Sequence, residues 1–166
     1  MLEIKNHYEI ERRFLVKYLP DLSGAEKADI VQYYLNDNVT RLRRMNDEYI
    51  LTQKSGSGLM RTEIEYSIDK SQFDNLKIGA KTFITKTRYF YPLDNLTCEI
   101  DIFNGKFDGI IIAEIEFATI EQAKSYTPPD FLGAEITLDK KLSNKQMSKN
   151  PKKAVEYFRK IYAENV

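Results

Sequence analysis

Alternation of apolar and polar residues dominates the chain and predicts β-strands. Successive side chains of a strand point to opposite faces, so an alternating segment presents one apolar face and one polar face. Turn sequences as short as Asn46-Asp47 separate most of the alternating segments, which favours hairpins between neighbours and an antiparallel sheet. The segments have roughly the usual strand length and lie at residues 7–16, 28–36, 39–45, 48–55, 60–68, 81–91, 96–104 and 110–118.

Three helical segments interrupt or follow the predicted strands. Asp69 is a candidate N-cap for a short helix, and Thr119 with Gln122 forms a capping box for a second one. The third begins near Pro151 and is amphipathic, so we expect it to cover a wall or an end of the sheet. Its apolar residues recur at three-to-four spacing and are Ala154, Val155, Phe158, Ile161 and Tyr162.

Length and composition narrow the class of protein. A chain of 166 residues with 42% hydrophobic content can bury one core, and without a repeat or a long linker it predicts one domain over residues 1–166. The single Cys98 excludes an internal disulfide framework. There is no signal-like N-terminus and no apolar run of about 20 residues, so we expect a cytoplasmic protein without a membrane span.

Charge is balanced overall but sorted along the sequence. Lys plus Arg and Asp plus Glu both number 25, so no global field attracts nucleic acid, yet 30% of the chain is charged. The polar faces of the predicted strands repeat charges at every second position. These residues are Glu9, Glu11 and Arg13; Arg41 and Arg43; Lys54; Arg61, Glu63 and Glu65; Lys86 and Arg88; Glu99 and Asp101; Glu114 and Glu116.

Such faces predict a charged interior. For any one strand a solvated outer face is the simpler interpretation, because antiparallel sheets commonly have one wet side. Repeated pairs of like charge argue against that interpretation, since charges at positions i and i+2 lie roughly 6.5–7 Å apart and repel each other. Eight strands closed into a barrel would turn these rows inward, where a metal ion and a polyanion could compensate both signs. We therefore predict a mainly β fold of the α+β type: a closed eight-stranded antiparallel barrel with flanking helices and a C-terminal helix.

The order of the charged segments resembles one known family. Glu9-Ile10-Glu11-Arg12-Arg13 is similar to the Glu-x-Glu-x-Lys motif of the CYTH superfamily, the triphosphate tunnel metalloenzymes, and the resemblance continues over about residues 7–118. The segments that carry it, in order, are Tyr33-Tyr34-Leu35, Arg41-Leu42-Arg43, Leu51-Thr52-Gln53-Lys54, Arg61-Thr62-Glu63-Ile64-Glu65, Lys86-Thr87-Arg88-Tyr89, Glu99-Ile100-Asp101-Ile102-Phe103 and Ala113-Glu114-Ile115-Glu116-Phe117.

The resemblance implies a tunnel that binds Mg²⁺ or Mn²⁺ and cleaves the terminal phosphoryl group of a triphosphate. It assigns metal binding to Glu9, Glu11 and Glu116, and catalysis to these together with Arg13 and Glu114. The residues expected to bind phosphate are Arg13, Arg41, Arg43, Lys54, Arg61, Lys86 and Arg88. The acids Glu63, Glu65, Glu99 and Asp101 would orient basic residues, bind a second metal or place water, although each could equally form an ion pair in the tunnel wall.

Arg13 stands where the family motif has Lys. A guanidinium can contact phosphate, but it stays protonated and cannot transfer a proton. This substitution keeps open a non-catalytic module that binds triphosphate or polyphosphate.

The expected reaction is in-line attack by water on inorganic tripolyphosphate, because cationic rows suit a phosphate chain and no aromatic platform for a base is evident. The alternatives on the same fold are a nucleoside triphosphatase and an adenylate cyclase. We expect no nucleic-acid or membrane partner. The physiological substrate, the choice of metal, the carboxylate that activates water, and whether the protein is a monomer or a homodimer stay open at this stage.

Overall fold

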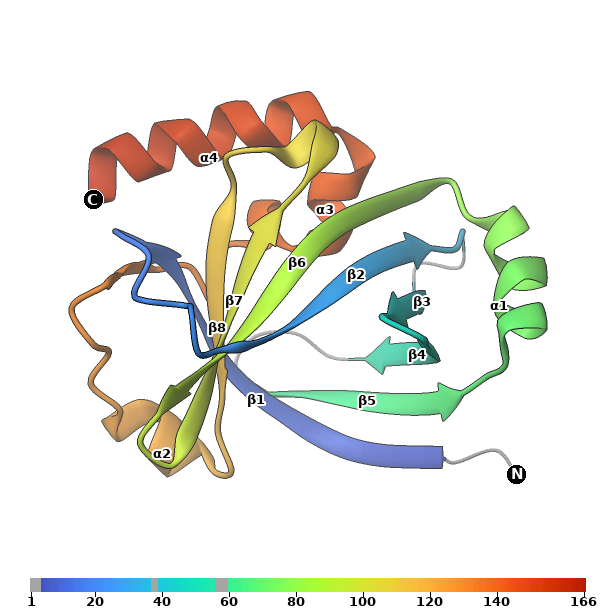
Figure 1. Cartoon of the computed structure of the whole chain (residues 1–166), viewed down its shortest axis with the longest axis horizontal. Coiled ribbons are helices and arrows are strands. Elements are labelled where there is room, and N and C mark those ends of the chain that lie inside the picture. Colours follow the sequence, from blue (N-terminus) through green and yellow to red (C-terminus); the bar gives the residue numbers. More distant parts are fainter. Residues whose placement is uncertain (1–3, 37–38, 56–59) are drawn as a thin grey trace.

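The structure is a computed structural model that describes residues 4–36, 39–55 and 60–166, with no side chains described at residues 4–7, 55, 60 and 61. Its centre is a closed antiparallel barrel of eight strands in the order β5-β4-β3-β2-β6-β7-β8-β1, closed by pairing of β1 with β5 (Figure 1). This confirms the predicted fold. The strands are β1 Ile4–Val16, β2 Glu26–Tyr34, β3 Thr40–Met45, β4 Glu48–Ser55, β5 Met60–Ser67, β6 Thr82–Leu93, β7 Leu96–Phe103 and β8 Ile111–Glu116.

Strand β1 closes the barrel because it serves several partners along its length. Its first part, through Ile10, pairs with β5, and its later part pairs with β8 from Glu11 to Leu15. Near the end of β1, a short ninth strand, β9 (Leu132–Glu135), replaces β5 as the partner on that edge and pairs at Phe14 and Val16. The alternation pattern did not predict β9, because four residues are too few to show a period.

The three predicted helices are confirmed as α1 (Lys70–Leu76), α2 (Ile120–Ser125) and α4 (Pro151–Asn165). Asp69 and Thr119 act as the expected N-caps, each accepting a hydrogen bond from the backbone N–H three residues ahead. Between β9 and α4 the structure adds elements that sequence reasoning missed. They are the 3-10 turn η3 (Lys140–Leu142) and the helix α3 (Asn144–Lys149); two further 3-10 turns are η1 (Lys77–Gly79) and η2 (Gly105–Phe107).

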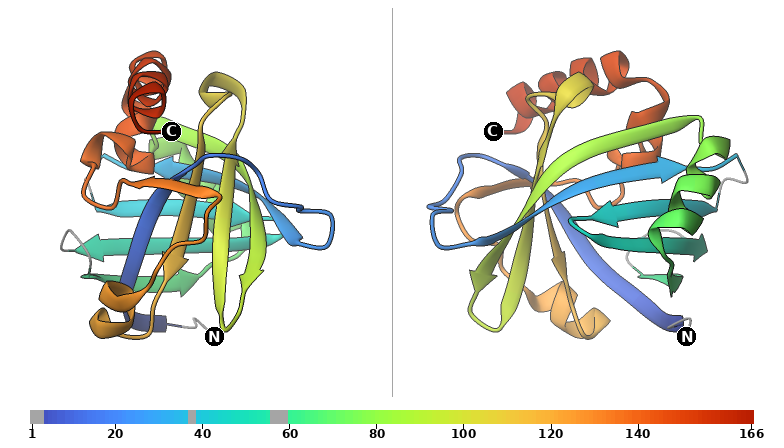
Figure 2. Two further views of the ribbon diagram at one scale, coloured as in Figure 1. Left: turned by 90° about the vertical axis from the view of Figure 1, so that its left-hand side faces the viewer. Right: turned by 45° about the vertical axis from the view of Figure 1, so that its right-hand side comes forward.

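Apolar residues pack in two clusters that leave the middle of the barrel polar. One lies outside the barrel, where α2 and residues 126–132 cover the outward faces of β1, β7 and β8 around Phe14 and Ile115. The other fills one end of the barrel, where Ile84 and Phe103 meet residues from α3 and α4. Figure 2 shows α3 and α4 gathered at that end. The cluster at this end consists of Leu15, Tyr34, Ile84, Phe103, Phe107, Ile110, Ile112, Ile136, Leu142, Met147, Ala154 and Phe158.

In the part of the chain that the structure describes, we find no helix with the length and apolar character needed to span a bilayer.

Arg12 fastens the segments after β8 to the outside of the barrel. Its Nη1 donates to the carbonyl oxygens of Ala123 and Tyr126, at 2.9 Å each. Its Nε and Nη2 form a two-pronged ion pair with Glu135 on β9, at 3.0 and 2.7 Å. A fork of this kind fixes direction as well as charge, because both carboxylate oxygens are engaged.

We expect Arg12→Ala to destabilise the protein by about 1–3 kcal/mol, because it leaves backbone carbonyls and Glu135 without their charged donor. For a chain of this size that corresponds to a fall in Tm of roughly 3–10 °C. Thermal unfolding followed by circular dichroism measures the change. Arg44→Ala, which removes an exposed arginine on the outer face of β3, is the matched control and should change Tm little. Equal effects of the two substitutions would show that the Arg12 contacts contribute nothing to stability.

Candidate functional site

A cavity of about 280 Å³ lies inside the barrel between the two ends. Ligand sites commonly occupy roughly 300–1,000 Å³, so this cavity suits a compact ligand. It brings together most of the residues that the charge pattern singled out: Glu9, Glu11, Arg13, Arg41, Arg43, Lys54, Glu63, Glu65, Arg88, Glu99, Glu114 and Glu116. Lys86 and Asp101 are buried but are not among the residues that line it. The side chain of Arg61 lies outside the described residues; its backbone pairs with Glu9.

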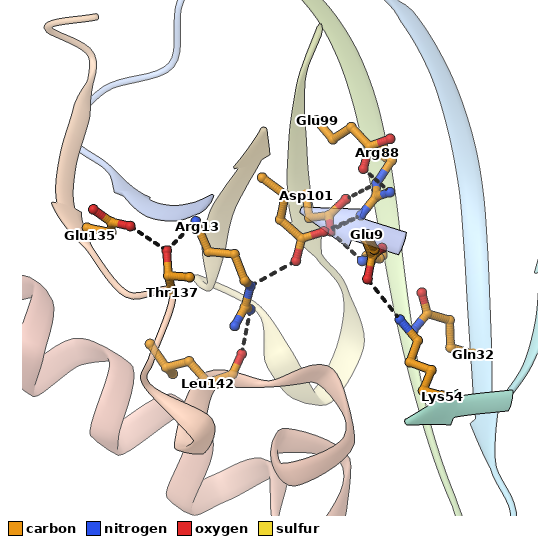
Figure 3. A network of polar contacts seen from close by, with 12 residues as sticks. Glu9, Arg13, Gln32, Lys54, Arg88, Glu99, Asp101, Glu135, Thr137 and Leu142 are labelled. Atoms are coloured by element: carbon orange, nitrogen blue, oxygen red, sulfur yellow. Dashed lines mark hydrogen bonds and ion pairs between the residues drawn. The ribbon is translucent and has the colours of Figure 1, made fainter. Parts of the chain in front are cut away.

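One wall of the cavity is a network of paired charges (Figure 3). Arg88 on β6 donates from Nε and Nη2 to Asp101, at 2.7 and 2.8 Å, and from Nη2 to Glu114 at 2.9 Å. Its Nη1 forms an ion pair with Glu99. Burial opposes the charge of Arg88, but the surrounding carboxylates outweigh it and raise the pKa of the guanidinium. Arg88 is thus a fixed cation whose hydrogen-bonding capacity is largely used by the protein.

Lys86 lies behind that wall. It is almost fully buried, forms an ion pair with Asp101 and places its ammonium group 5.4 Å from the centre of the Phe103 ring. Burial lowers the pKa of Lys86 to about 8, against the opposing attraction of Asp101. Asp101 therefore forms an ion pair in the tunnel wall with Lys86, which was one of the roles considered for the acidic residues. Lys86 does not line the cavity, but it shares Asp101 with Arg88, which does.

Arg13 on β1 links the paired wall to the closed end of the barrel. Its Nε donates to Glu114 at 3.0 Å, and its Nη2 donates to the carbonyl oxygen of Leu142 at 2.7 Å. Glu114 thus bridges Arg13 and Arg88. Because the contact with Leu142 joins β1 to the turn before α3, Arg13 connects the site to a segment far away in the sequence.

The opposite wall is short of anions. Arg41 and Arg43 on β3 share Glu65, whose carboxylate lies 3.7 and 3.6 Å from their Nη2 atoms. Arg41 also donates to Thr52 at 3.2 Å. Within the described part of the chain, the Nε atoms of both arginines are buried with no hydrogen-bond partner. A buried donor without an acceptor is costly, so these two N–H groups call for an anionic ligand.

The positive charges of this wall also repel one another. Burial, followed by repulsion from Arg41 and Arg88, lowers the pKa of Arg43 to about 10, only partly offset by Glu65. A bound polyanion would supply the missing negative charge. This wall therefore has the character of an anion site before any ligand is present.

Lys54 on β4 stands between two carboxylates. Its ammonium group forms an ion pair with Glu63 and lies 3.7 Å from Glu9. Burial first, and then a hydrogen bond with Glu9, raise the pKa of the Glu63 carboxyl above its ordinary value. Two carboxyl groups in contact favour either a shared proton or a cation near them.

The donors in the cavity fit a hard divalent cation by their chemistry. Glu11 on β1 and Glu116 on β8 are direct partners across the strand pair, and Glu9 lies two residues before Glu11 on the same face of β1. Carboxylate oxygens are the ligands that Mg²⁺ and Mn²⁺ prefer. Among the side chains that the structure describes, no three His, Cys, Asp or Glu residues are already gathered closely enough to hold an ion.

Several cavity residues were missed by sequence reasoning. Gln32 and Tyr34 on β2 face inward, with the amide of Gln32 donating to the Tyr34 hydroxyl at 2.9 Å. Burial raises the pKa of Tyr34 to about 12. The alternation of β2 could have identified both as inward-facing residues, but only charged positions were selected as candidates, and these two side chains are uncharged. Residues around the first positions of β3 and α3 also line the cavity, without any pattern that could have revealed them: Val39, Thr40, Ser143, Asn144 and Lys145.

Comparison with known proteins agrees with this arrangement. The model of the CYTH domain matches residues 7–152, and the chain belongs to this family. Among its curated relatives is an inorganic triphosphatase of Nitrosomonas europaea, 37% identical over 146 residues that cover 84% of this chain and 96% of the relative. An inorganic triphosphatase of Acetivibrio thermocellus is 34% identical over 87% of this chain and 96% of its own length.

Solved structures show the same fold. The crystal structure of an inorganic triphosphatase is 34% identical and superposes with a TM-score of 0.64, covering 84% of this chain and 93% of that protein. A protein of Pyrococcus horikoshii, 22% identical, gives a TM-score of 0.50 over 70% of this chain and 83% of its own, which is evidence for the fold alone.

The buried pair of Lys86 and Asp101 predicts a pH effect on stability. Between about pH 8 and 10.5 the unfolded chain keeps the proton of Lys86 while the folded protein loses it, so this group makes the free energy of unfolding rise with pH in that window. We expect Lys86→Met to remove a rise of about 1–3 kcal/mol. Denaturant titrations at several pH values measure it, with the exposed Lys81→Met as control. Identical slopes in wild type and Lys86→Met would contradict the lowered pKa.

Proposed function

We propose that this protein hydrolyses a triphosphate in a metal-dependent reaction, with inorganic tripolyphosphate as the preferred substrate, and that residues 1–166 carry the activity as one domain. The names of the two curated relatives support the reaction class. The observation that carries the proposal is the division of the cavity. On β3 the Nε donors of two buried arginines have no partner within the described ranges, while β1 and β8 supply carboxylates to the lining.

The proposed roles follow from that division. Arg41 and Arg43 bind phosphate oxygens, because their Nε–H groups, which have no acceptor among the described residues, would gain one from the ligand. Lys54 adds a mobile point charge on the same side. Arg88 stays in its network of carboxylates and keeps Asp101 and Glu114 in position rather than reaching for the ligand. Charge that develops on the transferred phosphoryl group is thus met by cations already in place.

The acidic residues divide between two tasks. Glu9, Glu11 and Glu116 would hold Mg²⁺ or Mn²⁺, which when bound neutralises phosphate charge and polarises the phosphorus–oxygen bonds. Glu114 keeps Arg13 and Arg88 in position through hydrogen bonds of 3.0 and 2.9 Å. Glu65 holds the two arginines of β3 on the open wall.

Selectivity for an inorganic chain is supported by what the lining lacks. Among the described residues that line the cavity, Tyr34 is the one aromatic side chain, and its hydroxyl is already engaged by Gln32. Recognition of a nucleobase usually relies on stacking, which one buried ring at the apolar end does not readily offer. The binding energy should therefore come from the phosphates.

We expect phosphate release from tripolyphosphate to require added Mg²⁺ or Mn²⁺ and to exceed that from ATP in kcat/KM by about tenfold or more, because ATP buries a base with no matching surface. A panel of tripolyphosphate, ATP, thiamine triphosphate and pyrophosphate, each with either metal and with chelator, measures this. Equal or higher efficiency on ATP would assign the protein to the nucleoside triphosphatases. Tight metal-dependent binding without phosphate release would make it a binding module.

We expect Arg43→Ala to lower kcat/KM for tripolyphosphate by roughly 100-fold, since loss of a charged hydrogen bond to a phosphoryl group costs about 2–3 kcal/mol. The matched control is Arg44→Ala, the next residue on β3, whose side chain is exposed on the outer face. Steady-state kinetics at one pH and one metal concentration compares the two. A loss in Arg44→Ala as large as that in Arg43→Ala would show that the charge of β3, and not the inward position, is responsible.

A further inference from the structure

The segment between β9 and α4 forms part of the cavity although it lies outside the eight strands. After β9 the chain passes through η3 and enters α3, and Ser143, Asn144 and Lys145 at this point line the cavity. On either side of them in the sequence, Leu142 and Met147 pack into the apolar cluster that fills the end of the barrel. This segment, residues 136–149, which we call the closing segment, therefore supplies part of the cavity lining.

Arg13 fixes the closing segment through its backbone and its side chain. Its backbone N–H donates to the Thr137 hydroxyl at 2.9 Å, and its carbonyl oxygen accepts from the N–H of Ile136 at 2.8 Å. Its Nη2 reaches the carbonyl oxygen of Leu142 at 2.7 Å, next to Ser143, the N-cap of α3. Figure 3 shows the side chain extended from β1 towards that carbonyl.

The contacts use the shape of a guanidinium. Nε is bonded to Glu114 and Nη2 to Leu142, so one planar group spans an anion on β8 and a carbonyl in the closing segment. A lysine carries one nitrogen on a flexible chain and cannot hold both acceptors in a fixed geometry. With two of its three nitrogens already bonded to the protein, Arg13 is better suited to placing other groups than to gripping phosphate.

We propose that Arg13 is a positioning residue that holds Ser143–Lys145 at the inner end of the cavity, and that this segment makes the site selective for the length of the phosphate chain. The inference rests on the proposed function. The third phosphate of a triphosphate would reach the inner end, where Lys145 supplies a cation and Asn144 has a buried side-chain oxygen without a partner among the described residues. Rotation of that amide presents N–H donors at the same place. Pyrophosphate, one phosphate shorter, would not extend to these groups.

The kinetic test uses two constants that do not depend on the fraction of active enzyme: the KM for tripolyphosphate and the competitive inhibition constant Ki of pyrophosphate. We expect Arg13→Lys to retain turnover but to lower the ratio of Ki to KM by roughly tenfold, because a displacement of about 1 Å in a binding group can cost up to a hundredfold. Arg44→Lys is the matched control. It makes the same exchange at an exposed arginine on the outer face of β3, so it should leave the ratio within about twofold.

A second variant acts on the segment itself. Lys145→Ala leaves Arg13 in place and should lower the same ratio, and the double variant should be no worse than the more affected single variant, because both changes act through one group of residues. Independent effects that multiply, or an unchanged ratio in Lys145→Ala, would overturn the proposal.

Hydrogen exchange separates this inference from the proposed reaction, because it requires no turnover. In the ligand-free protein, Arg13→Lys should increase exchange in peptides covering residues 136–149, whereas Arg44→Lys should not. If exchange rises as expected but wild type releases no phosphate, the positioning role stands and the hydrolytic function fails. If wild type hydrolyses tripolyphosphate while both exchange and the ratio are unchanged in Arg13→Lys, the positioning role fails.

Discussion

The burial of charge inside a closed barrel is the constraint on which this structure depends. Closure turns one face of every strand inward, and in this chain that face carries guanidinium, ammonium and carboxylate groups that lose much of their hydration. On one side, ion pairs and hydrogen bonds compensate for the lost hydration, because Arg88 and Glu114 belong to a continuous network. On the other side the compensation is partial, because the Nε donors of Arg41 and Arg43 find no acceptor in the part of the chain that the structure describes. Unequal compensation is what turns a charged barrel into a binding site.

This division also explains why residues with similar sequence settings differ in the fold. Lys86 and Arg88 belong to one Lys-x-Arg pair on the inward face of β6, yet Lys86 lies behind the wall and Arg88 borders the cavity. The apolar layer at the closed end determines the difference. Ile84 on the same face already belongs to that layer, so Lys86 lies at its boundary and is buried over Phe103. Depth along the barrel, rather than residue type, sets the environment of each charge.

The sequence was sufficient to predict the strands and the inward rows, because period-two alternation encodes both, and turns such as Asn46-Asp47 encode the connections; Asn46 adopts the positive φ of 52° that such a turn uses. It was not sufficient for β9 or the closing segment. Those residues carry no long periodic pattern, and their positions depend on tertiary contacts such as the hydrogen bonds of Thr137 and Leu142 with Arg13. Nor could it identify which cations are already neutralised, since that depends on cross-strand distances that register alone does not fix.

The several partners of β1 have a consequence for how the chain folds. Arg13 contacts Glu114, Thr137 and Leu142, which follow it by 101, 124 and 129 residues. Strand β1 therefore leaves the ribosome well before the segments that complete its pairing, and part of its edge stays unpaired until residues 132–142 have been synthesised. Contacts so distant in sequence make folding slow. The alternating charges of β1 protect it during that interval, because a strand with Glu9, Glu11 and Arg13 on one face is a poor template for aggregation.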